Sequence, residues 1–211
     1  MTRSLLYFYL AAIVVILSCG EQYGYKGNSQ NWFLDSTSNS VPQRFQGEFR
    51  EKWNANLLKL KLKSIDKGFD GSIIRIVRAN ALDDTIRLLE VAKMDNHFSG
   101  RYLLFNNDII RKELPGFFLQ EGHEPKSGWK EIFQSLERLN IASLPDEEML
   151  QGYRTPMDGS NVIIEVAKKN GYRIFSYGTP EYNQNFEEVK YLIRGLEILN
   201  NELDTKFWTS Q

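Results

Sequence analysis

The sequence predicts an α+β domain, built on a mainly antiparallel sheet of five or six strands with two amphipathic helices on one face. Three observations carry this prediction. Short β-branched and apolar runs alternate with turn residues, Asn170-Gly171 stands between two such runs, and two later segments repeat apolar residues at helical spacing. Short strands joined by turns form antiparallel sheets, and helices with one apolar face bury that face against the sheet.

The first expected strand is Leu58–Lys63 (LKLKLK), where leucine and lysine alternate with the period of two that a half-buried strand requires. A helix continuing from Glu48 stays open as an alternative, because Leu, Lys and Glu also favour helices. Three strands with clear turn residues around them follow, at Ser72–Arg78, Thr85–Lys93 and Arg101–Phe105. Opposite charges on neighbouring strands should pair, with Glu165 a partner for Arg75 or Arg173.

Two helices and a hairpin complete the expected domain. Ser127 can cap a helix that runs to about Leu139, and a longer amphipathic helix should span Phe186–Leu203. Between them, Val162–Ala167 and Tyr172–Tyr177 flank Asn170-Gly171, the pair that most favours a tight hairpin turn.

The amino terminus has the pattern of an export signal. Arg3 precedes an apolar run of 13 residues, Leu5–Leu17, and Ser18, Cys19 and Gly20 follow. As a helix this run spans about 20 Å, short of the roughly 30 Å of a membrane's hydrocarbon core. Cleavage by ordinary signal peptidase and retention as an uncleaved anchor are two possible fates, and lipid attachment at Cys19 is the third.

The lipid-attachment fate is the one we favour. Ile16-Leu17-Ser18-Cys19 resembles a bacterial lipobox, which implies cleavage before Cys19, a diacylglycerol on its sulfur and an acylated amino group. Cys19 is the single cysteine, so the chain can form no intrachain disulfide. The chain then divides into a lipoprotein signal peptide (residues 1–18), a flexible tether (19–43) rich in Ser, Asn, Gly and Gln, and one α+β domain (44–211). The lipid bilayer is its first expected partner, through acylated Cys19.

Composition and motifs favour no cofactor, metal or nucleic acid. The formal net charge is −1, which gives nucleic acid no basic surface. His97 and His123 stand far apart in the sequence, and a Gly-x-Ser-x-Gly elbow is missing. A hydrolase site would need two acids brought together by the fold, and Asp158 and Glu165 are the candidates. We therefore expect no catalytic residue and no metal site.

One constellation is a candidate for partner binding. Tyrosines, arginines and an acid gather around the predicted hairpin, and Tyr and Arg are enriched at interfaces. The alternative is a sheet face whose aromatic side chains are packed by a helix. The candidate residues, for a protein or glycan partner, are Tyr153, Arg154, Asp158, Tyr172, Arg173 and Tyr177.

From about Leu58 to Leu203 the chain resembles lipoproteins and secreted proteins of Bacteroidota that have no known function. The residues that carry the resemblance are Ile74-Arg75-Ile76, Ile86-Arg87-Leu88, Ser127-Gly128-Trp129, Leu144-Pro145-Asp146, Asp158-Gly159, Ile164-Glu165, Tyr172-Arg173, Tyr177 and Pro180. The resemblance implies a location in the cell envelope and no particular activity.

The expected function is that of a lipid-anchored envelope protein, attached to the outer membrane and facing the periplasm, with a non-catalytic binding or structural role. Two alternatives stay open. One is an envelope hydrolase whose site is assembled only in the fold, and the other is a periplasmic antagonist of a toxin or enzyme.

Overall fold

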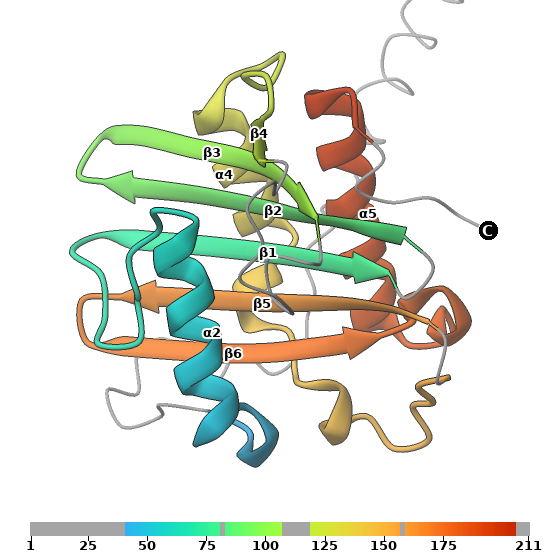
Figure 1. The fold of residues 1–211 in the computed structure, drawn as a ribbon. Helices are drawn as coiled ribbons and strands as arrows, with labels where there is room; N and C mark the ends of the chain where they lie inside the picture. Colours follow the sequence, from blue (N-terminus) through green and yellow to red (C-terminus); the bar gives the residue numbers. More distant parts are fainter. Residues whose placement is uncertain (1–40, 81–82, 107–118, 157–158, 206–211) are drawn as a thin grey trace, which may run out of the picture.

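A six-stranded antiparallel sheet with helices on both faces forms the domain. The computed structural model describes residues 41–80, 83–106, 119–156 and 159–205. The sheet order is β4-β3-β2-β1-β5-β6, and every neighbouring pair is antiparallel (Figure 1). The strands are β1 (Ser72–Asn80), β2 (Asp83–Met94), β3 (His97–Asn106), β4 (Leu119–Glu121), β5 (Ser160–Lys168) and β6 (Gly171–Gly178).

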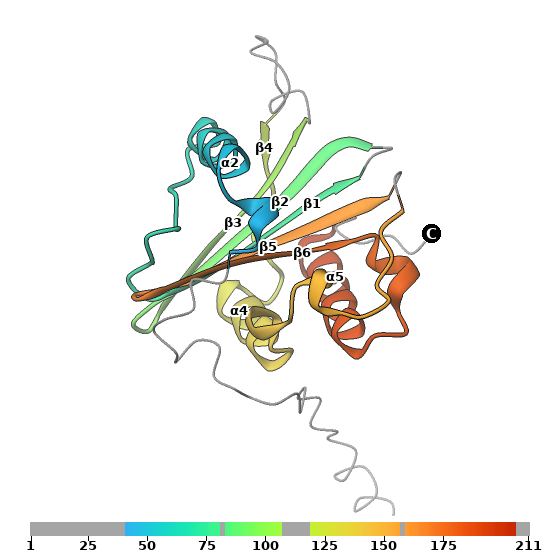
Figure 2. The same ribbon diagram turned by 90° about the horizontal axis from the view of Figure 1, so that it is seen from below.

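Three α-helices lie on the two sides of this sheet. Helices α4 (Trp129–Arg138) and α5 (Glu187–Leu203) cover one face, and α2 (Glu48–Lys59) covers the other (Figure 2). Four short 3-10 helices occur in the connections: η1 (Gln43–Phe45), η2 (Ile141–Ser143), η3 (Glu147–Met149) and η4 (Pro180–Asn183). The predicted α+β class is confirmed, and so are the hairpin and both predicted helices.

The largest core lies between the sheet and the pair α4 and α5. Ile132, Phe133 and Leu136 of α4 pack with buried residues of α5 and with the inward-facing residues of the central strands. On the α2 side, two smaller apolar clusters flank a polar centre at Arg75. The central strands are therefore buried on both faces, which is why they contain long apolar runs with few polar interruptions.

The prediction of a strand at Leu58–Lys63 was wrong, and the helical alternative is correct. Helix α2 ends at Lys59, and Lys61 adopts a left-handed conformation with φ 58°. The Leu62 amide donates to the Leu57 carbonyl and the Lys61 amide to the Leu58 carbonyl, each at 2.9 Å. This is the paired hydrogen-bond pattern of a Schellman helix end, with Leu57 and Leu62 packed in the same cluster. The leucine and lysine alternation therefore marks a helix end.

The start of α4 also differs from its prediction. Gly128 occupies the cap position, and Ser127 makes no cap hydrogen bond. Instead, the backbone amide and hydroxyl of Ser127 both donate to the Glu202 carboxylate at 2.8 Å. The hydroxyl is thus used to join the beginning of α4 to the last turn of α5, because α4 and α5 pack side by side.

The amino-terminal predictions concern residues outside the described part of the chain. These are the signal peptide, Cys19 and the tether as far as Ser40. Within the described ranges, none of the helices combines the length and the apolar character that crossing a membrane requires.

Candidate functional site

The structure places Tyr172 and Tyr177 on opposite faces of β6. Tyr172 faces α2, and its hydroxyl donates to the Glu165 carboxylate at 2.6 Å. Tyr177 faces the larger core, and its hydroxyl donates to the Pro145 carbonyl at 2.5 Å. The two side chains are 2% and 0% exposed. Neither side chain is accessible to a partner. Both fit the alternative interpretation, in which the aromatic side chains of the sheet face are packed by a helix.

Arg173 is buried as well and serves the connection after α4. Its guanidinium donates to the carbonyls of Ala142 and Leu144, the first at 3.1 Å. Burial lowers the pKa of the Arg173 guanidinium from its ordinary value. Such a cation would be costly to bury without these carbonyl acceptors, so Arg173 fixes the path of the chain through η2.

Tyr153 and Arg154 lie where β6 ends. The Tyr153 hydroxyl donates to the Gly178 carbonyl at 2.9 Å, and its ring packs edge-on against Tyr177 at 6.0 Å between centroids. Asn183 holds the backbone of Arg154 through two hydrogen bonds, while the Arg154 side chain is exposed. The structure thus joins Tyr153 to Tyr177 and separates both from Tyr172.

The predicted partner surface is reduced by these placements. Three of its six residues are buried, Tyr153 is half-buried, and Asp158 lies outside the described residues. Of the five described residues only Arg154 is exposed, so a partner-binding role at this hairpin stays a prediction that rests on Arg154.

The edge of β6 is closed by two carboxylates that sequence reasoning did not single out. Asp146 accepts a hydrogen bond from the Ser176 amide at 3.1 Å, and Glu147 accepts one from the Gly178 amide at 2.5 Å. The Arg44 guanidinium, just before α2, pairs with Asp146 at 2.6 Å. The sequence carries only a local signal here, Pro145-Asp146 ahead of two glutamates, and this signal does not show which strand the carboxylates reach. An edge strand's free amides attract other strands, and these carboxylates occupy the amides of Ser176 and Gly178.

A buried ion-pair network crosses the α2 face of the sheet. Arg75 pairs with Glu165 at 2.7 Å and with Glu90 at 2.5 Å, and it also donates to the Lys63 carbonyl at 3.0 Å. Burial alone would lower the pKa of the Arg75 guanidinium, but the charges of Glu165 and Glu90 outweigh it and raise that pKa. The predicted pairing of Glu165 with Arg75 is confirmed. Glu165 is therefore committed to this network and to Tyr172.

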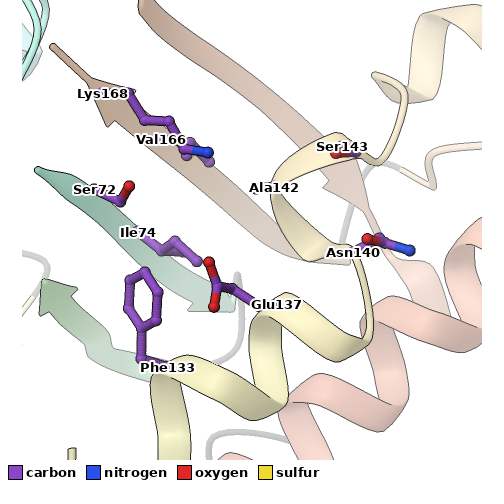
Figure 3. Close-up of a pocket in the computed structure, with 9 residues that line it drawn as sticks. All are labelled: Ser72, Ile74, Phe133, Glu137, Asn140, Ala142, Ser143, Val166 and Lys168. Carbon is purple, nitrogen blue, oxygen red and sulfur yellow. The ribbon is translucent and has the colours of Figure 1, made fainter. Parts of the chain in front are cut away.

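An open pocket of about 150 Å³ lies between the carboxyl end of α4, η2 and the sheet (Figure 3). Its apolar floor is formed by Ile74 of β1, Val166 of β5 and Phe133 of α4. The polar rim and remaining wall are formed by Ser72, Glu137, Asn140, Ala142, Ser143 and Lys168. A cavity of about this volume accommodates a single six-membered ring, so the pocket suits a small molecule.

Opposite charges stand on opposite walls of this pocket. Glu137 extends from the last turn of α4 toward Ile74, and Lys168 extends from the end of β5 over Val166 toward η2 (Figure 3). Ser72 is the register partner of Lys168 on the neighbouring strand. The carbonyl end of α4 adds partial negative charge on the side of Glu137. The helix wall is thus negative and the sheet wall is positive.

Neither a metal site nor a family match adds to this picture. Among the described residues, no group of three or more His, Cys, Asp or Glu side chains could hold a metal ion. No family model matches the chain, and a search of curated proteins finds no match either.

Proposed function

We propose that this protein is a lipid-anchored component of the cell envelope that acts by binding a ligand. Acylated Cys19 holds it in the bilayer, residues 19–43 form the tether, and the α+β domain faces the periplasm from the outer membrane. The observation that carries the anchor is the order of features in the sequence: a basic end, an apolar run too short to span a membrane, and the lipobox-like Ile16-Leu17-Ser18-Cys19. The resemblance to Bacteroidota lipoproteins supports the same location.

The binding role is supported by the pocket between α4 and the sheet. Its apolar floor, charged rim and open mouth are the combination by which small-molecule sites gain affinity and orientation. Several acyl chains on one residue would anchor the domain stably, since each buried CH₂ contributes about 0.8 kcal/mol and a single chain is marginal.

The anchor is tested by intact mass and metabolic labelling of the chain expressed in a Gram-negative host. We expect a mature protein that begins at Cys19, incorporates a labelled fatty acid and partitions into detergent. Cys19→Ser should abolish labelling, and an inhibitor of lipoprotein signal peptidase should cause the full-length precursor to accumulate. A mature protein with an unmodified Cys19 would contradict the proposal and favour plain secretion.

The matched control is Ser18→Ala, which keeps a small residue before the cysteine and should leave labelling intact. Membrane fractionation then separates the remaining alternatives. An uncleaved anchor would stay in the membrane without the fatty acid and with residues 1–18 present.

A further inference from the structure

We infer that one end of the domain docks on an anionic phospholipid bilayer and so orients the anchored domain on the membrane. The inference rests on the lipid anchor proposed above and adds the protein surface that meets the same bilayer. We call this surface the basic end. It comprises residues 56–71, from the last turn of α2 to the start of β1, the turn between β2 and β3 (94–97) and the turn between β5 and β6 (168–171).

The three segments of the basic end lie together at one end of the sheet, on the left in Figures 1 and 2. Two close backbone approaches join them. The Phe69 amide donates to the Lys168 carbonyl at 3.1 Å, next to the β5–β6 turn. A Cβ added at Gly71 would lie 2.2 Å from the backbone oxygen of Lys93, next to the β2–β3 turn. The segment after α2 therefore lies against both turns, and all three contribute to one surface.

Unpaired positive charge dominates this end. Its exposed lysines form no ion pair with any described residue, and we call them the basic-end lysines: Lys59, Lys61, Lys63, Lys67 and Lys169. The exposed acids here are Asp70 and Asp95. The third acid, Asp66, is already bound by Arg50 and Asn54, at 3.4 Å and 3.2 Å. The formal net charge of −1 thus conceals a local positive excess, and each lysine near an anionic surface strengthens binding about fivefold.

Two exposed apolar side chains stand among these charges. Leu58, in the last turn of α2, is 68% exposed, and Met94, at the end of β2, is 45% exposed. The neighbouring Leu57 is buried in the core, so the helix end is firmly packed and leaves Leu58 on its outer side. Apolar side chains beside lysines are typical of surfaces that lie in a membrane interface, where apolar groups enter the headgroup boundary. This favours a bilayer over an acidic protein.

The proposed tether is long enough to bring the basic end to the bilayer. The first described residue, Val41, precedes η1, and α2 then extends about 18 Å toward the basic end, because its 12 residues each rise about 1.5 Å. A coil of about 20 residues between Cys19 and Val41 spans about 25 Å. Docking by the basic end turns η4 and the adjacent Arg154, at the opposite end of the sheet, away from the membrane.

The test is lysine footprinting of the mature protein, reconstituted from detergent into vesicles of phosphatidylcholine alone or mixed with phosphatidylglycerol. A low dose of an acetylating reagent marks accessible ammonium groups, and mass spectrometry reads each lysine separately. We expect the basic-end lysines to react about tenfold more slowly on the anionic vesicles, because their summed attraction holds the domain on the surface. Lys130 and Lys190, exposed on α4 and α5, are internal controls and should react equally on both.

Salt and a soluble polyanion test the nature of the contact. About 1 M salt shortens the Debye length to about 3 Å and should remove the protection. Equal reactivity of the basic-end lysines on both kinds of vesicle would overturn the inference. Protection by soluble polyglutamate without protection by vesicles would also overturn it, and would indicate an acidic protein as the partner.

Variants with equal changes in charge assign the effect to this end. Lys63→Gln combined with Lys67→Gln and Lys169→Gln should return the reactivity of Lys59 and Lys61 to within about twofold of its value on neutral vesicles. The control variant should keep the protection, because it removes the same charge from the side of α4 and α5. Its substitutions are Lys126→Gln, Lys130→Gln and Lys190→Gln. Unchanged protection in the first variant, or lost protection in the second, would contradict the assignment.

The same vesicles separate this inference from the anchor. Retention on phosphatidylcholine vesicles reports the anchor, and protection that depends on phosphatidylglycerol reports the basic end. A protein that stays on both kinds of vesicle without protection overturns the basic end alone. A protein that leaves neutral vesicles but floats with anionic ones at low salt overturns the anchor alone.

Discussion

Arg75 and Glu165 face each other across β1 and β5, with the guanidinium Nη1 2.7 Å from the carboxylate Oε2, at a position where both side chains are almost completely buried. Glu90, on the other side of β1, is the second partner of Arg75 and is 21% exposed. The Tyr172 hydroxyl donates a hydrogen bond to the other carboxylate oxygen of Glu165, Oε1. The two apolar clusters of the α2 face lie on either side of this network, so it divides a core that would otherwise be continuous.

Removing Arg75 should be much more harmful than neutralising Glu165. Arg75→Met leaves the Glu165 carboxylate buried with only Tyr172 as a donor, and we expect a loss of about 3–5 kcal/mol in the free energy of unfolding. Glu165→Gln keeps an acceptor for Tyr172 and leaves Arg75 paired with Glu90, so the loss should be about 1–3 kcal/mol. Urea denaturation of both variants measures the two losses and shows which is larger.

The control for this pair of variants is Glu48→Gln, which removes an exposed carboxylate on α2 that pairs with the likewise exposed Lys52. Its free energy of unfolding should change by less than about 0.5 kcal/mol. Equal losses for Arg75→Met and Glu165→Gln would contradict this prediction. They would show that the remaining contacts, Arg75 with Glu90 and Tyr172 with the side chain at position 165, do not compensate for neutralising Glu165.

The closed edge of β6 gives a second prediction. Asp146→Ala combined with Glu147→Ala removes the acceptors of the Ser176 and Gly178 amides, so both amides should exchange faster with deuterium. The opened edge should also pair with other copies, giving association that increases with concentration in size-exclusion chromatography. Glu148→Ala is the matched control, because Glu148 lies in the same turn and is largely exposed, and its pair with Arg44 does not involve the amides of β6. Unchanged exchange in the double variant would refute the role of the two carboxylates.

The sheet could be predicted because local patterns determine it. Ser72–Arg78 and the hairpin around Asn170-Gly171 are strands with turn residues at both ends, and the observed elements β1, β5 and β6 contain them. The pairing of Arg75 with Glu165 followed from the same reasoning, because opposite charges inside a sheet are stable only as neighbours. The apolar stripes of α4 and α5 likewise need only the helical period.

Features that depend on distant segments could not be predicted. Leu58–Lys63 has the period of a strand, and only its packing against Val77 and Leu88 shows that it ends a helix. Tyr172 and Tyr177 are five positions apart in a strand, which places them on opposite faces, and both are buried because helices cover both faces of the sheet. The pocket draws its residues from β1, β5, α4 and η2, so no local pattern in the sequence contains it.

Two glycines at the beginnings of strands, Gly71 just before β1 and Gly171 at the first position of β6, should respond differently to the addition of one methyl group. Gly71 has φ 126°, and a Cβ there would lie 2.2 Å from the backbone oxygen of Lys93. Because that oxygen is part of the sheet and cannot move freely, Gly71→Ala should lower the free energy of unfolding by about 2–4 kcal/mol. At Gly171 no atom lies within 4 Å of the added Cβ and φ is not positive. Gly171→Ala should therefore change the free energy of unfolding by less than about 1 kcal/mol. Thermal denaturation of the two variants is the measurement, and similar losses would contradict the close approach of Gly71 to the Lys93 backbone.

The buried tyrosines should make the domain sensitive to alkali. Burial raises the pKa of the Tyr177 hydroxyl, and burial together with the charge of Glu165 raises the pKa of Tyr172. Above about pH 10 the unfolded chain loses these protons while the folded domain keeps them. The unfolded state then binds fewer protons, so the stability that is fully present below about pH 10 falls by about 1.4 kcal/mol per pH unit for each tyrosine.

Tyr177→Phe separates this effect from general alkaline unfolding. At neutral pH the variant should be less stable by about 1 kcal/mol, because the hydrogen bond to the Pro145 carbonyl is lost. Above about pH 10 its stability should fall less steeply than that of the wild type, since phenylalanine has no proton to lose. Tyr182→Phe, at a side chain that is 68% exposed, should keep the wild-type slope. Urea denaturation at a series of pH values gives the slopes, and equal slopes for Tyr177→Phe and the wild type would show that the Tyr177 hydroxyl reaches solvent before the domain unfolds.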